Sequence, residues 1–115
     1  MTLMSKPPLM NGIQTDLWHL LCLQIELGKK LKKLKVKRAW QKGLDASVSW
    51  REFCWQPQYK ITERYAQEVI YTATLFEKRK LRYEDIKGCP NRRELIEGLK
   101  DRNWKDKIIF WQSLL

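Results

Sequence analysis

The sequence feature that most limits how this 115-residue chain can fold is a stripe of leucines between positions 17 and 34. Apolar side chains recur there every three or four residues, a spacing that aligns them on one side of an α-helix. The stripe therefore predicts a helix of about 25 residues or more with one packing face. Asn11 or Thr15 is suited to cap its start, and Gly43 is suited to end it. The stripe consists of Leu17, Leu20, Gln24, Leu27, Leu31 and Leu34, with Leu21 beside it.

Helical spacing continues in the middle of the chain. A short helix is predicted from "WREFCW", which follows Ser47 and Ser49 as possible starts, and Ser49 and Glu52 have the spacing of a capping box. A second long helix is predicted from about Gln58 to Arg82. Its apolar positions are Ile61, Tyr65, Ala66, Val69, Ile70, Ala73 and Phe76.

The last third of the chain carries three more helical signals. "YEDIKGCP" indicates one turn of helix closed by Gly88 and Pro90, and Asn91 is placed to cap the helix that follows it. No segment alternates with period two, so strands are not expected. We therefore predict an all-α fold, a compact bundle of about five helices. The apolar positions of the last two helices are Leu95, Ile96 and Leu99, then Trp104, Ile108 and Trp111.

The length of the chain suits one domain with a single core. We expect residues 1–12, which include Pro7, Pro8 and Gly12, to form an irregular lead-in, and residues 13–115 to form one helical-bundle domain. The three cysteines are scattered, and "MTLMSKPPLMNG" does not read as a secretory signal. The most apolar segment, "LWHLLCLQIEL", is too short to span a bilayer. These features favour a cytoplasmic protein without a membrane partner.

The net charge of +10 is concentrated in one segment. Between Leu27 and Gly43 there are eight Lys or Arg residues and no carboxylate. Like charges spaced along a helix destabilise it, and an ordinary solvated face mixes the two signs. A basic solvated face remains one interpretation, but a surface that faces a polyanion explains the pattern better.

The lysine-rich helix and the end of the second long helix supply the candidate nucleic-acid-binding residues. Four lysines of the first set point away from the leucine stripe on the helical wheel, and Lys32 and Lys35 flank it. The second cluster, "EKRKLR", also complements the negative C-terminal end of a helix, which is an alternative structural role. The candidates are Lys29, Lys30, Lys33, Lys37, Arg38 and Lys42, then Lys78, Arg79, Lys80 and Arg82.

The sequence does not predict an enzyme. His19 is the single histidine, the cysteines show no zinc spacing, and the glycines are isolated. An acidic pair followed by a lysine, Glu84, Asp85 and Lys87, resembles a nuclease metal site only in composition, since it falls at a helix end. We therefore expect no catalytic residue, no metal, no cofactor and no small-molecule substrate.

Six tryptophans are many for a chain of this length. Trp40 is either a core anchor or a platform for stacking bases, and the core is the favoured role. The other five lie on or near apolar stripes and are expected in the core. A surplus of large aromatic side chains would instead serve a contact with another protein. These five are Trp18, Trp50, Trp55, Trp104 and Trp111.

Four binding modes are compatible with the basic surface. A helix-turn-helix reader would use Arg92 and Arg93 of "NRRELIEGLKDRNW", but acidic residues follow them directly. A membrane-surface helix would need the leucines that the core requires. Backbone binding without base readout suits a patch richer in Lys than in Arg, because Lys is a point charge and not a planar fork. A scaffold that docks an acidic protein is the alternative from another class.

Three stretches, "KKLKKLKVKR", "ITERYAQEVIYTATLFEKRK" and "NWKDKIIFWQSLL", together with the small size and basic charge, resemble the small subunit of Cascade-type CRISPR–Cas effector complexes. The resemblance is architectural and spans nearly the whole chain. It implies a helical bundle without catalytic activity that works in antiviral defence. Such a subunit holds the crRNA–target DNA duplex or the displaced strand through basic surfaces. The implied partners are this nucleic acid, other subunits of the ribonucleoprotein complex and further copies of the chain itself.

Overall fold

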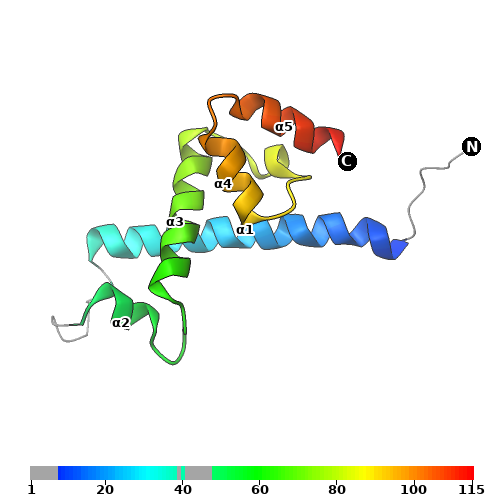
Figure 1. Ribbon diagram of the computed structural model, residues 1–115. Coiled ribbons are helices and arrows are strands. Elements are labelled where there is room, and N and C mark those ends of the chain that lie inside the picture. Colours follow the sequence, from blue (N-terminus) through cyan, green and yellow to red (C-terminus); the bar gives the residue numbers. More distant parts are fainter. Residues whose placement is uncertain (1–7, 39, 41–47) are drawn as a thin grey trace, which may run out of the picture.

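The computed structural model describes residues 8–38, 40 and 48–115, and these residues contain helices and no strand. The prediction of an all-α bundle of about five helices is confirmed (Figure 1). The elements are α1 (Pro8–Lys37), α2 (Trp50–Cys54), α3 (Glu63–Lys78), the 3-10 turn η2 (Tyr83–Ile86), α4 (Arg92–Lys100) and α5 (Trp104–Ser113).

Helix α1 is the axis of the fold, and α3 crosses it in its C-terminal third, at Gly28 (Figure 1). The crossing separates two clusters of buried side chains. One joins the N-terminal half of α1 to the C-terminal half of α3, η2, α4 and α5, around Leu21, Ile25 and Leu99. The other joins the C-terminal half of α1 to α2 and the start of α3, around Leu31 and Phe53. The long helix therefore holds the two ends of the bundle together.

The crossing of α1 and α3 depends on Gly28. A Cβ atom at this position would overlap the backbone carbonyl of Val69 and would lie 3.0 Å from Cβ of Ala73. The backbones of the two helices are therefore in direct contact, which only a residue without a side chain permits. Val69 and Ala73 are fully buried at this contact.

The predicted caps are confirmed at two helices. The Ser49 hydroxyl accepts a hydrogen bond from Glu52 N at 3.1 Å, and the Asn91 side chain accepts one from Glu94 N at 2.9 Å. These bonds satisfy backbone N–H groups that have no partner within a helix. The expected turn at "YEDIKGCP" is η2, and Gly88 follows it with a φ of +105°.

Four predicted helix boundaries are wrong, the start and the end of α1 and of α3. Residues 8–12, expected in the irregular lead-in, belong to α1, because Pro8 at the first helical position loses no hydrogen bond there. Helix α1 ends at Lys37, followed by Arg38 in the left-handed conformation with a φ of 51°, whereas Gly43 lies outside the described residues. Helix α3 starts only after Thr62, whose hydroxyl accepts from Tyr65 N at 3.1 Å, and it ends at Lys78 instead of Arg82.

Burial also differs from the prediction at two positions. Leu20, assigned to the packing stripe, is 58% exposed, while Ile25 is fully buried in its place. Trp55, expected in the core, is 51% exposed. Trp40 is only 9% exposed and packs in the second cluster, so its assignment to the core is confirmed. Trp111 is buried, and Trp18, Trp50 and Trp104 are half-buried against the two clusters.

Candidate nucleic-acid interface

The lysines of α1 lie on the C-terminal half of the helix. Because the leucine stripe there packs against the protein, most of these lysines are on the outer side. Lys30, Lys33 and Lys37 are exposed, as is Arg38 just beyond the helix end. Lys32 is half-buried at the margin of the packed face. The predicted amphipathic helix with a basic outer side is therefore present in the described residues, whereas Lys42 lies outside them.

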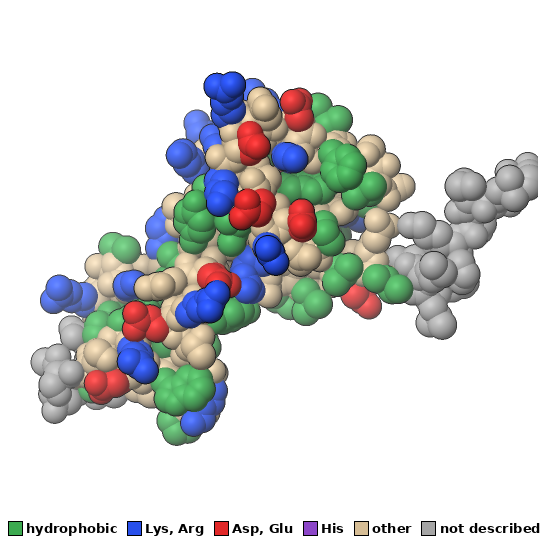
Figure 2. Space-filling view, in the orientation of Figure 1, with side chains coloured by type: hydrophobic (Ala, Val, Ile, Leu, Met, Phe, Trp, Pro, Cys, Tyr) green, Lys and Arg blue, Asp and Glu red, His purple; other side chains and the backbone are tan. Residues whose placement is uncertain are grey.

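These lysines line a shallow groove of about 520 Å³ between α1 and the end of α3. Five lysines face two carboxylates there, so the groove is strongly cationic, and an exposed valine lies among them. Elsewhere the signs mix: Figure 2 shows acidic and basic side chains interspersed over α4 and α5. The groove residues are Lys29, Lys30, Lys32, Lys33, Val36, Lys37, Glu26 and Glu77.

The Lys29 side chain contacts other residues of the protein through its ammonium group. Its ammonium donates a hydrogen bond to the Tyr83 hydroxyl at 3.1 Å and lies 3.7 Å from the Glu26 carboxylate. It also lies over the ring of Tyr83, 5.2 Å from the centroid, and over that of Phe76, at 5.5 Å. The hydrogen bond to Tyr83 raises the pKa of Lys29 and outweighs the opposing effect of burial, with smaller contributions from neighbouring charges. Lys29 therefore joins α1 to η2, and less of its charge is available to a ligand.

We expect Lys29→Ala to lower the free energy of unfolding by about 1 kcal/mol, through loss of the Tyr83 hydrogen bond and the ring contacts. Lys30→Ala, which removes an exposed side chain one position away, should change stability by less than about 0.5 kcal/mol. Thermal or urea denaturation of the two variants measures the difference. Equal midpoints for both would contradict the structural role of Lys29.

The second predicted cluster is divided by the fold. Lys78 and Lys80 are exposed, and Arg82 is exposed beside Asp85, with 3.8 Å between guanidinium and carboxylate. Arg79 instead donates a hydrogen bond from Nε to the Leu99 carbonyl at 3.0 Å and lies 5.1 Å from the centre of the Trp104 ring. It joins the end of α3 to α4 and α5. Since Glu77 lines the basic groove, the segment that carries the second cluster starts at the edge of that groove.

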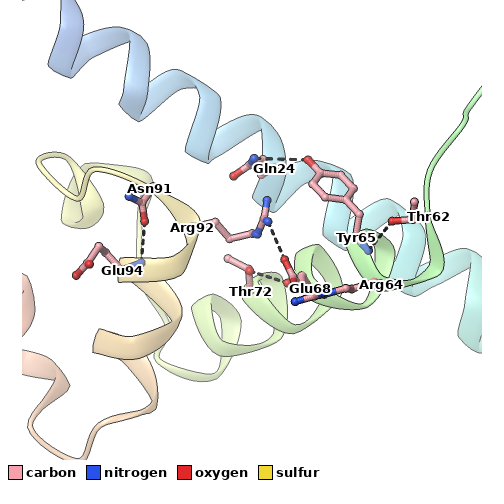
Figure 3. Close-up of polar contacts among 9 residues, drawn as sticks. All are labelled: Gln24, Thr62, Arg64, Tyr65, Glu68, Thr72, Asn91, Arg92 and Glu94. Atoms are coloured by element: carbon pink, nitrogen blue, oxygen red, sulfur yellow. Dashed lines mark hydrogen bonds and ion pairs between the residues drawn. The ribbon is translucent and has the colours of Figure 1, made fainter.

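Arg92, the first arginine of the helix-turn-helix interpretation, is held by α3. Its guanidinium lies 2.7 Å from the Glu68 carboxylate and 4.9 Å from the centre of the Tyr65 ring (Figure 3). Tyr65 also accepts a long hydrogen bond, 3.5 Å, from Gln24 of α1. The start of α4 is thus built into the interface with α3 and α1, an arrangement that does not favour Arg92 as a base-reading residue.

Groups suited to catalysis have structural partners. The Asp85 carboxylate accepts a hydrogen bond from the Arg82 backbone N–H at 2.8 Å, and Lys87 lies over the Trp18 ring, 5.1 Å from its centre. Burial raises the pKa of Cys89 to about 12, so its thiol is neutral at physiological pH. In the described ranges no three His, Cys, Asp or Glu side chains come together as metal ligands. None of the helices there is long and apolar enough to cross a membrane.

Four groove residues were not among the site residues predicted from the sequence: Lys32, Val36, Glu26 and Glu77. Lys32 was placed only on the flank of the stripe, and Glu77 could not be associated with α1 because the contact is between helices distant in sequence. No protein-family model, no curated protein and no solved structure matches this chain. Its function is therefore inferred from its side chains and their charge.

Proposed function

We propose that this chain is a non-catalytic protein that binds the phosphate backbone of nucleic acid without reading its sequence. The observation that carries the proposal is the groove beside α1, which is lined by five lysines from just over two turns of one helix. In line with the resemblance to Cascade small subunits, the chain would act within a larger ribonucleoprotein complex. There it would hold the target duplex or the displaced strand.

The side chains that suit phosphate contacts are Lys30, Lys32, Lys33 and Lys37. Three of them are exposed, and all four line the groove. An ammonium group meets a phosphate as a point charge in many orientations, whereas a planar arginine fork favours defined base edges. A rigid helix that presents ammonium groups therefore favours binding that depends on salt and not on sequence.

The test is fluorescence anisotropy with labelled single-stranded DNA, RNA and duplex DNA of equal length, each titrated at several salt concentrations. Four phosphate contacts should give a slope of log affinity against log salt of about −3.6 for duplex and about −2.8 for single strands. Scrambled sequences should bind equally well. An absence of binding to all three at low salt would contradict the proposal.

A second function is favoured by Val36. This side chain is 75% exposed in the middle of the lysines, and an apolar contact of this kind suits a protein surface better than a phosphate. The alternative function is a scaffold that docks an acidic protein on the same groove. Heparin would then compete poorly for the groove, because shape as well as charge would determine the binding.

A further inference from the structure

Trp55 is the one exposed tryptophan of the six, all of which lie in the described part of the chain. It is 51% exposed at the end of α2, whereas the other five are buried or half-buried. Its side chain lines an open cleft of about 770 Å³ between α2 and the start of α3. Figure 2 shows hydrophobic side chains beside basic and acidic ones over this end of the molecule. The cleft shares no residue with the basic groove, so it is a second candidate site.

The segment from Trp55 to Ile61 is closed into a loop by backbone hydrogen bonds. The Ile61 N–H donates to the Cys54 carbonyl at 2.8 Å, and the Lys60 N–H donates to the Gln56 carbonyl, also at 2.8 Å. Lys60 has the left-handed conformation, with a φ of 49°, and its ammonium lies over the Trp55 ring, 5.1 Å from the centroid. Lys60 does not line the cleft, so the part of the ring that faces the cleft is not the part that this lysine covers.

The polar groups of the cleft do not favour one sign of charge. The guanidinium groups of Arg51 and Arg64 line it, and so do the carboxylates of Glu52 and Glu63. The Thr62 hydroxyl, which caps α3, lines it as well and still has a proton to donate. A strongly acidic or basic peptide would meet like charges at two of the four charged groups. The ligand that fits is flat, uncharged and bordered by both hydrogen-bond donors and acceptors.

We propose that this cleft binds an unpaired base of single-stranded nucleic acid, with the base stacked on the Trp55 ring. A nucleobase has the two flat faces and the mixed donor and acceptor edge that the lining requires. Stacking on an aromatic side chain holds single strands with little regard to sequence, because every base has such a face. Lys60 beside the ring supplies a positive charge for a neighbouring phosphate.

The cleft and the basic groove adjoin the same half of α1. The groove is lined by the C-terminal half of this helix, and the second cluster packs α2 and the start of α3 against that half (Figure 1). A strand that binds the groove lysines therefore has the cleft at the same end of the molecule. The inference rests on the proposed function and adds a preference for single strands, because the bases of a duplex are already stacked and paired.

The test is fluorescence anisotropy of Trp55→Leu and Trp55→Phe with labelled single-stranded DNA, the same strand built from abasic units, and duplex DNA. Trp55→Leu should lower the affinity for single-stranded DNA about tenfold, whereas Trp55→Phe, which keeps a ring, should retain most of it. Neither variant should alter binding of the duplex or the abasic strand, which offer phosphates but no unpaired base. The salt slope for single-stranded DNA should not change, because no phosphate contact is removed.

Tyr71→Leu is the matched control. Tyr71 is an aromatic residue of α3 that is 45% exposed and does not line the cleft, so this variant should bind single-stranded DNA like the original protein. Melting temperatures check that each variant is folded. If Trp55→Leu does not fold, the comparison of the normal and abasic strands on the unaltered protein decides the question.

Two results would overturn the inference and leave the basic groove intact. One is equal affinity of Trp55→Leu and the original protein for single-stranded DNA. The other is binding of the abasic strand as tightly as the normal strand. Failure of the proposed function would look different, since neither the duplex nor either single strand would then bind at low salt.

Discussion

Replacing Lys30, Lys33 and Lys37 together by Glu should abolish binding to single-stranded DNA, RNA and duplex DNA. The three residues lie on the exposed side of α1 and line the same groove, so the triple variant changes its charge by six units. Each lysine that contacts a phosphate releases a counterion, and the reversed charges would repel the backbone as well. We expect an affinity loss of about a thousandfold or more at low salt, measured by fluorescence anisotropy.

The triple variant should lose affinity for nucleic acid without losing stability. The three side chains are exposed, so the free energy of unfolding should stay within about 1 kcal/mol of the original. The matched control reverses Arg102, Lys105 and Lys107, which are exposed near and on α5 and change the net charge equally. The control should retain most of the affinity. Equal losses in the two variants would mean that net charge, and not the groove, governs binding, and an unfolded triple variant would mean that these lysines support the fold.

Gly28→Ala should be strongly destabilising. The added methyl group would overlap the Val69 carbonyl, so α1 and α3 would have to separate along their whole crossing. Both clusters of buried side chains depend on that crossing. Overpacking against backbone cannot be relieved by a rotamer change, and we expect a loss of about 3 kcal/mol or more. Thermal and urea denaturation measure the effect.

Gly12→Ala is the matched control within the same helix. Apart from the neighbouring backbone of α1, no atom of the described residues lies within 4 Å of a Cβ added at Gly12, so the variant should gain the usual advantage of alanine in a helix, about 0.5–1 kcal/mol. If Gly28→Ala lowers the free energy of unfolding and Gly12→Ala raises it, the loss at Gly28 comes from the contact with α3 and not from helix propensity. A Gly28→Ala variant as stable as the original protein would contradict the close approach of α1 and α3.

The capping signals of Ser49 and Asn91 were read correctly because they are local. Ser49 and Asn91 each bond a backbone N–H three residues further along, and no distant residue is involved. The exposure of Leu20 and Trp55 could not be predicted from such local signals. Helical spacing aligns Leu20 with the packed leucines, but whether it is covered depends on where α3 and α4 cross α1. Trp55 lies just after α2, and its exposure follows from the chain turning away there.

The candidate site was likewise predictable only where local sequence determines it. The run from Leu27 to Gly43 identified the basic side of α1. It contains eight cationic residues and no carboxylate, and this excess can be counted without knowing how the helices pack. Two of the predicted site residues, one from each basic cluster, have other partners in the fold. Lys29 is bonded to Tyr83, and Arg79 is bonded to the Leu99 carbonyl. Those contacts join residues 54 and 20 positions apart, so no local pattern predicts them.

The sequence by itself determined the helical class, the helix caps at Ser49 and Asn91 and the location of the positive charge, since each depends on spacing and composition along one segment. The tertiary structure alone decided which apolar side of α1 is buried, which lysines stay exposed and that Gly28 lies at the crossing with α3. The physical reason is that burial and side-chain bonding are properties of pairs of segments. Their outcome depends on the angle and register at which α3 and α4 meet α1, and those are set by the packing of the whole core.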